Sequence, residues 1–299
     1  MPKLNVCIKC GSVDTVIKSG KTQNNVQRFK CKSCLRTYIL DESPTKGFKN
    51  SDYLFKKFIG LMIDDVTLEV IARNLNINIK TAHYYRYIVF HALSEYQSKV
   101  KLSGTILLDE TFISIKEKEF RIYKPDGKAF RGLSRNVLAI ITLIDLNGIS
   151  VAKVASRATP SPKDYIDLLT MNIGNVELFV SDGNTHTKQF FSKFSVERID
   201  TSLYVGDEFN LKLLDSYHNN LKRYLFKHIG HKLKNIQYYL DFYVYRSNYI
   251  AMSRPENMTD MKLIKNKMTD KLFKLIKRKE KTITYRSFLK SKGIKDILE

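Results

Sequence analysis

The stretch Ile106-Leu107-Leu108-Asp109-Glu110-Thr111 decides the fold, because it places a carboxylate inside an apolar strand. An uncompensated charge there would cost several kcal/mol of desolvation unless it faced a metal ion or a polar cleft. The apolar strand Leu178-Phe179-Val180 repeats the situation, since it ends in Ser181-Asp182-Gly183-Asn184. A strand-terminal Asp before Gly is often only a turn or a helix cap. Carboxylates at the ends of neighbouring strands can also converge on one ion, however, so the two aspartates together predict a shared cation site.

The segments around these strands follow a definite order. Strands are predicted at 105–116, 136–145 and 149–155, helices at 162–171 and 185–194, a strand at 176–180, and further helices from near Leu211 and Asn235. The residues Leu146-Asn147-Gly148 predict a hairpin turn between the second and third strands. The resulting order, βββαβα followed by helices, predicts an RNase H-like core.

A third carboxylate would complete a two-metal site, and Asp215 offers one on a predicted helix. His218 and Lys222 follow three and seven residues later, so all three side chains share one helical face. The carboxylate could then meet a metal while the basic groups meet phosphate. Glu208 is the rival third ligand. In the alternative interpretation, His218 is a packing histidine with its polar atoms satisfied and Lys222 is a solvated charge.

Two Cys-x-x-Cys knuckles, Cys7 with Cys10 and Cys31 with Cys34, are separated by about twenty residues. Four thiolates at this spacing suit tetrahedral Zn²⁺, and a reducing compartment favours metal ligation over disulfides. Because protein would fill all four positions, no position is left for water. The spacing therefore predicts structural zinc in a small β-ribbon, with a redox role for either pair as the alternative.

Between residues 51 and 97 the hydrophobic period is that of helices, predicted at 51–62, 67–75 and 80–96. The tight connection Asn76-Ile77-Asn78 gives the spacing of a helix-turn-helix, in which Ala72 allows two helices to approach closely. The early turns of the last helix carry the candidate DNA-binding residues Lys80, Thr81, His83, Tyr84 and Arg86. An ordinary three-helix bundle is the alternative.

The charge balance indicates a polyanionic partner. The chain has 51 Lys and Arg against 30 Asp and Glu, a formal net charge of +21, which favours nucleic acid, although a basic balance can also serve solubility alone. The longest apolar runs are far shorter than the ~20 residues that span a bilayer, and the first residues lack the pattern of a secretory signal. We therefore expect a cytosolic protein without a membrane partner.

These patterns predict a multidomain α+β protein. We expect a zinc ribbon at 1–42, a helix-turn-helix domain at 48–98, the RNase H-like core at 103–254 and a lysine-rich helical tail at 255–299, with a linker at 43–47. The sequence of the tail leaves open whether its lysine residues bind DNA or only form a solvent-exposed face.

Over nearly all of residues 5 to 250, the chain resembles bacterial insertion-sequence transposases of the DDE superfamily, in the subgroup with an amino-terminal zinc ribbon. The matching motifs are Gln27-Arg28-Phe29-Lys30-Cys31-Lys32-Ser33-Cys34, Leu108-Asp109-Glu110-Thr111, Ser181-Asp182-Gly183, His218-Asn219-Asn220-Leu221-Lys222-Arg223, Tyr238-Tyr239-Leu240-Asp241-Phe242 and Tyr245-Arg246-Ser247-Asn248.

The resemblance implies that Asp109 and Asp182 are catalytic and that Asp215 is the third member, with Lys222 and His218 at the phosphate backbone. This chain departs from the family at the third position, which is commonly Glu and in some relatives Asn. The resemblance also implies catalytic Mg²⁺ or Mn²⁺, double-stranded DNA as transposon ends and target, a homo-oligomer on that DNA, and a place on the cytoplasmic nucleoid. Two rival functions are a DNA-binding regulator with an inert core and a nuclease that does not join strands.

Overall fold

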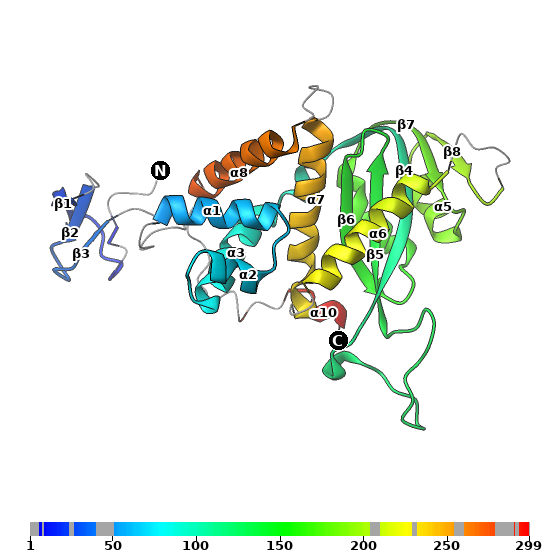
Figure 1. Ribbon diagram of the computed structural model, residues 1–299, viewed down its shortest axis with the longest axis horizontal. Helices are drawn as coiled ribbons and strands as arrows, with labels where there is room; N and C mark the ends of the chain where they lie inside the picture. Colours follow the sequence, from blue (N-terminus) through cyan, green and yellow to red (C-terminus); the bar gives the residue numbers. More distant parts are fainter. Residues whose placement is uncertain are drawn as a thin grey trace.

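The computed structural model describes residues 6–7, 9–23, 27–39, 51–203, 210–228, 232–253, 260–278, 290 and 293–298. Its centre is a five-stranded mixed sheet with helices on both faces (Figure 1). The strands are β4 (Leu102–Ser114), β5 (Val137–Asp145), β6 (Ser150–Arg157), β7 (Ile173–Ser181) and β8 (Glu197–Asp200). This α+β arrangement is compatible with the RNase H-like core that the sequence predicts.

The sheet order is β6-β5-β4-β7-β8. The pairs β4–β5 and β5–β6 are antiparallel, whereas β4–β7 and β7–β8 are parallel. The long β4, which carries Asp109, therefore lies in the middle, beside β7, whose end leads directly to Asp182. The sequence did not predict β8, a four-residue strand that extends the sheet beyond β7.

Side-chain alternation along β4 separates two apolar layers. Ile106 and Leu108 pack with α4 (Pro162–Leu169) and α5 (Thr185–Phe191) on one face. Leu107 and Ile113 pack on the other face, which is covered by α6 (Lys212–Lys227) and α7 (Ile236–Ser253). Asp109 lies on the same face of β4 as Leu107, so its side chain points toward α6.

Three helices precede the sheet: α1 (Ser51–Ile63), α2 (Leu68–Asn74) and α3 (Ile79–Leu93). Their apolar residues belong to the same buried cluster as α6 and α7. The basic helix α8 (Met261–Arg278) joins that cluster through Ile264, Met268, Leu272 and Ile276. Its apolar face thus packs inside the protein, and the division of 48–299 into three domains stays a prediction.

Shorter elements complete the described part of the chain. They are the 3-10 turns η1 (Gln97–Lys99), η2 (Lys118–Phe120), η3 (Thr170–Asn172) and η4 (Leu233–Asn235), and the helix α10 (Lys295–Leu298). The helices α3 and α5 each end three residues earlier than predicted, at Leu93 rather than Tyr96 and at Phe191 rather than Phe194. None of the described helices is long and apolar enough to cross a bilayer.

The outer edge of β6 is covered by amide side chains. Asn248 accepts from the Ser150 backbone N–H at 2.8 Å and donates to its carbonyl at 2.9 Å. Gln97 makes the same two-way contact with Ala152, at 2.8 and 2.9 Å. Gln237 accepts from the Val154 N–H at 2.9 Å. Side chains from η1 and α7 thus take the place of a sixth strand along three alternate residues.

The cysteine-rich segment forms a separate antiparallel sheet in the order β1-β2-β3. Its strands are β1 (Val16–Lys21), β2 (Gln27–Cys31) and β3 (Thr37–Ile39). Phe29 and Tyr38 stack at 6.3 Å and form a small cluster with Cys7 and Cys31. So small an apolar cluster is typical of a module that depends on a metal for stability.

Candidate active site and zinc centre

The register of β4 and β7 brings the two predicted aspartates together. Leu108 pairs with Ser181 in a parallel ladder, so Asp109 and Asp182 follow at equivalent positions. Asp109 continues β4, whereas Asp182 stands in the loop just past the end of β7. Both carboxylates therefore lie where β7 stops and leaves β4 without a parallel neighbour.

Glu110 is a third carboxylate at this point. Ligand oxygens of Asp109, Glu110 and Asp182 all lie within 4.8 Å of one another. The Glu110 carboxylate also accepts a hydrogen bond from the Tyr165 hydroxyl on α4. Sequence reasoning did not single out Glu110, because neighbours on a strand point to opposite faces, and only the tertiary structure shows that both can reach Asp182.

Burial and neighbouring negative charge disfavour the charged forms of Asp109 and Glu110. Burial, followed by the charges of Glu110, Asp182 and Asp215, raises the pKa of Asp109 to about 7. Burial likewise raises the pKa of Glu110, and the charge of Asp182 adds to the effect, against the lowering by the Tyr165 hydrogen bond. A bound divalent cation would relieve this repulsion, and oxygen ligands of this kind suit Mg²⁺.

Helix α6 closes the site from the other side. The His218 Nδ1 lies 3.8 Å from the Asp109 Oδ2, and the His218 side chain is only 7% exposed. Burial, together with the charge of Lys222, lowers the pKa of His218 to about 4, so the ring is neutral near pH 7. Its Nε2 is buried without a hydrogen-bond partner among the described residues. Lys222 follows one helical turn later on the same face.

Asp215 lies exposed in the first turn of α6. Its carboxylate does not belong to the group of three oxygens within 4.8 Å, although its charge contributes to the raised pKa of Asp109. Its role as third ligand stays a prediction. The rival Glu208 lies outside the described residues.

A glycine shapes the loop that presents Asp182. Gly183 has φ +81°, and a Cβ there would lie 2.1 Å from the Asp200 carboxylate. Only glycine fits this close approach. Beyond it, the Asp182 carboxylate accepts from the Asn184 N–H at 3.1 Å, and the Asn184 side chain caps α5 by accepting from His186 N at 3.0 Å. The loop is thereby fixed between β7 and α5.

The four cysteines converge as their spacing predicts. The Cys7 and Cys34 sulfurs lie 3.8 Å apart, and those of Cys10 and Cys31 lie 3.7 Å apart. The edge of a tetrahedron with Zn–S bonds of ~2.3 Å is about 3.8 Å. The residues present therefore fit a zinc ion held by four thiolates.

The surroundings of Cys31 favour its thiolate form. Hydroxyls of Ser12 and Thr15 lie 3.5 and 3.3 Å from its sulfur, and the Cys34 backbone N–H donates to it at 3.5 Å. Donation from Ser12, then from Thr15, lowers the pKa of Cys31 to about 5. A deprotonated sulfur is the form that ligates zinc.

The candidate DNA-binding residues on α3 differ in exposure. Lys80 is exposed, and Thr81, His83 and Tyr84 are partly buried. Arg86 is only 8% exposed, and its guanidinium lies over the Tyr239 ring of α7 at 5.2 Å. Lys80 is thus the most solvent-exposed of the five, Tyr84 packs partly against the core, and Arg86 connects α3 to α7.

No family model and no curated protein matches the chain. Among solved structures, the chain is similar to the "Mos1 transposase paired-end complex with left transposon end" at a TM-score of 0.25 and 12% identity, over 75% of this chain and 79% of that chain. A likeness this remote carries no argument about fold or function. The function is therefore inferred from the chain's own side chains.

Proposed function

We propose that the protein is a DNA transposase, which binds the terminal inverted repeats of an insertion sequence and cleaves and joins DNA with bound Mg²⁺ or Mn²⁺. The observation that carries the proposal is the convergence of Asp109, Asp182 and Glu110 within 4.8 Å at the end of β7. The net charge of +21 supplies the attraction for a polyanionic substrate.

In this proposal, some site residues bind the metal and others bind the DNA phosphate. Asp109 and Asp182 would hold two metal ions. Such a pair, when bound, activates a water molecule and stabilises the leaving 3′ oxygen. Lys222 would bind a backbone phosphate beside the carboxylates. His218, being neutral, keeps its ring against Asp109 without adding positive charge. The 3′-hydroxyl released by cleavage would then attack a phosphodiester of the target DNA. The new phosphodiester bond forms as the target's P–O3′ bond breaks, which leaves a 3′-hydroxyl on the target strand and needs no covalent protein intermediate.

Two residues compete for the place of the third metal ligand. Asp215 is favoured by the sequence pattern and lies on the same helical face as His218 and Lys222. Glu110 is favoured by its distance from Asp109 and Asp182. The Tyr165 hydroxyl that binds Glu110 would orient the carboxylate as a supporting hydrogen bond does at many metal sites.

Recognition of the DNA ends falls to the amino-terminal half. In a helix-turn-helix, α2 would cross the backbone and α3 would lie in the major groove with Lys80, Thr81, His83 and Tyr84 near the bases. The ribbon held by structural zinc would add a second contact. Because two transposon ends must be held together, the active assembly would contain at least two copies of the chain, in the cytoplasm on nucleoid DNA.

The test is a strand-transfer assay on labelled DNA that carries the element's own ends, with Mg²⁺. We expect Asp182→Ala to abolish both cleavage and joining. The matched control is Asp167→Ala, because Asp167 is an exposed aspartate on α4 outside the carboxylate group. Loss of products in Asp182→Ala alone would support a transposase that uses this site.

Other results of the same assay separate the rival functions. Cleavage by the wild type without joining would make it a nuclease, and DNA binding with neither reaction would make it a regulator. Glu110→Gln and Asp215→Asn then identify the third ligand, because only the ligand's replacement should raise the Mg²⁺ concentration needed for half-maximal cleavage.

A further inference from the structure

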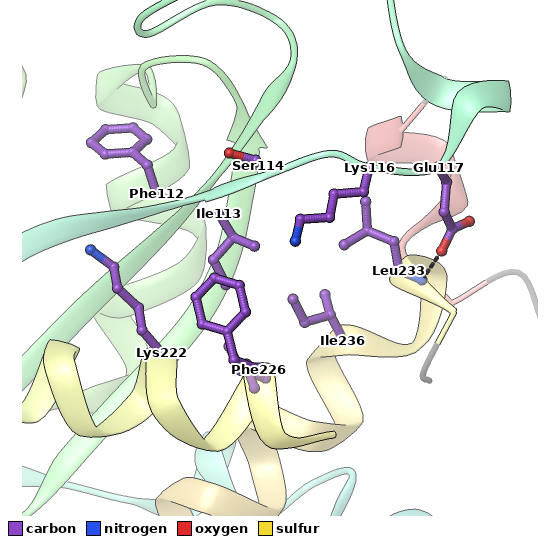
Figure 2. A pocket seen from close by; sticks show the side chains of 10 residues that line it. Phe112, Ile113, Ser114, Lys116, Glu117, Lys222, Phe226, Leu233 and Ile236 are labelled. Atoms are coloured by element: carbon purple, nitrogen blue, oxygen red, sulfur yellow. Dashed lines mark hydrogen bonds between the residues drawn. The ribbon is translucent and has the colours of Figure 1, made fainter. Parts of the chain in front are cut away.

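A cavity of about 300 Å³ lies between the end of β4, the last turns of α6 and the start of α7. Its walls are mainly apolar and include Phe112, Ile113, Phe226 and Ile236 (Figure 2). The Phe226 ring is 57% exposed. A large apolar ring left at the mouth of a cavity is a surface to which a ligand can bind.

The cavity has a cationic rim. Lys116 and Lys222 both line it, and the Lys116 ammonium lies 5.3 Å from the centre of the Phe226 ring (Figure 2). The acidic residue among the lining side chains, Glu117, accepts a hydrogen bond from the Leu233 N–H at 2.5 Å. Its carboxylate is therefore engaged by backbone, and the rim presents two amines around an apolar floor.

One helix, α6, connects the cavity with the carboxylates, because it carries both His218, whose Nδ1 lies 3.8 Å from the Asp109 Oδ2, and cavity-lining residues. Lys222 follows His218 by four residues and Phe226 follows it by eight, on the same face of α6. At 1.5 Å per residue these steps are about 6 and 12 Å along the axis. On the sheet side, Ile113 lies on the same face of β4 as Asp109. A DNA strand at the carboxylates can therefore reach the cavity within one or two nucleotides.

We propose that this cavity binds an unpaired nucleobase of the DNA strand held at the carboxylates. A nucleotide combines a flat apolar face with an anionic phosphate, and the cavity combines an aromatic floor with two amines. Base stacking on an exposed aromatic side chain is sequence-tolerant and favourable. The inference rests on the proposed function, since it takes DNA as the substrate. A wholly apolar ligand would make no use of Lys116 and Lys222.

The test compares two DNA duplexes of equal charge, one with a 3′ overhang of thymidines and one with an overhang of abasic residues. Binding is measured by fluorescence anisotropy with Ca²⁺ in place of Mg²⁺. We expect the wild type to bind the thymidine overhang about 5- to 150-fold more tightly, the range that stacking of one base supports. Phe226→Ala should bind both overhangs alike. Phe226→Leu, which keeps an apolar side chain without a ring, should lose most of the preference.

The matched control is Phe130→Ala. Phe130 is also an exposed phenylalanine with a lysine over its ring, Lys124 at 5.8 Å, but it does not line the cavity. Its replacement should leave the preference for bases intact. Equal binding of both overhangs by the wild type would overturn the proposal, as would an equal loss on both overhangs in Phe226→Ala.

The outcome is independent of the reaction itself. If the wild type prefers bases through Phe226 but neither cuts nor joins DNA, the nucleobase site is supported and the transposase function is contradicted. If the wild type cuts and joins DNA without any preference for bases, the transposase function is supported and the nucleobase site is contradicted.

Discussion

Replacement of Asn248 by alanine should destabilise the sheet strongly, because Asn248 is fully buried and pairs with a strand edge. Its Oδ1 accepts from the Ser150 backbone N–H at 2.8 Å and from the Ser150 hydroxyl at 2.9 Å. Its Nδ2 donates to the Ser150 carbonyl at 2.9 Å. The Ser150 hydroxyl keeps a second partner in the Tyr217 hydroxyl, at 3.0 Å.

The magnitude follows from the groups that Asn248→Ala leaves unpaired. The backbone N–H and carbonyl of Ser150 would both be buried without a partner, and each such group costs about 1–3 kcal/mol. The expected loss is therefore about 2–6 kcal/mol, against a total stability of about 5–15 kcal/mol for a folded protein. With a denaturant slope of about 3 kcal/mol per molar of urea, the midpoint should fall by about 0.7–2 M.

Urea unfolding followed by far-ultraviolet circular dichroism measures this shift. The matched control is Asn219→Ala, which makes the same chemical change at an exposed position on α6 and should move the midpoint by less than ~0.2 M, an effect within about 0.5 kcal/mol. If Asn248→Ala unfolded at the same urea concentration as Asn219→Ala, the pairing of α7 with the β6 edge would contribute nothing, and the reasoning would be refuted.

Three further predictions concern metal, charge and backbone. Cys31→Ser should lose zinc and unfold the ribbon, seen as a lower zinc content per chain by elemental analysis with the far-ultraviolet spectrum of the helices retained. Asp241→Asn should flatten the pH dependence of stability. Burial raises the pKa of Asp241 to about 7, so the wild type loses stability as pH rises from about 4 to about 7. The variant should therefore unfold at a higher urea concentration than the wild type at about pH 8, but not at about pH 5. Gly183→Ala should lower the melting temperature and Mg²⁺-dependent cleavage together, because the added methyl group would collide with Asp200; a variant with unchanged melting would show that the loop moves freely.

The parts of the fold that follow from the sequence are those with strong local patterns. The apolar strand that ends before Asp182 is present as β7, whereas the metal-binding role of Asp182 stays a prediction. The spacing of the four cysteines predicts the cluster that they form, and this cluster fits zinc. In contrast, β8 has only four residues, Glu197 to Asp200, with a single strongly apolar side chain and no alternation long enough to detect.

The parts that sequence could not provide depend on contacts between distant segments. Glu110 joins the carboxylates because Tyr165, 55 residues later, binds its side chain. Arg86 has the spacing of a residue on a recognition helix, but the aromatic ring of Tyr239 from α7 lies against it. Helical periodicity predicts which residues share a face, and it does not say which of two polar faces another helix will cover.

The amide-covered edge of β6 has a consequence for how copies of the protein can meet. An uncovered edge strand is a template for another chain's strand, and many proteins block it with charge or with proline. Here Gln97, Gln237 and Asn248 occupy the backbone groups that an incoming strand would need. A neighbouring copy cannot extend the sheet on this side without displacing all three, so crowding of many copies would not fuse their sheets through β6.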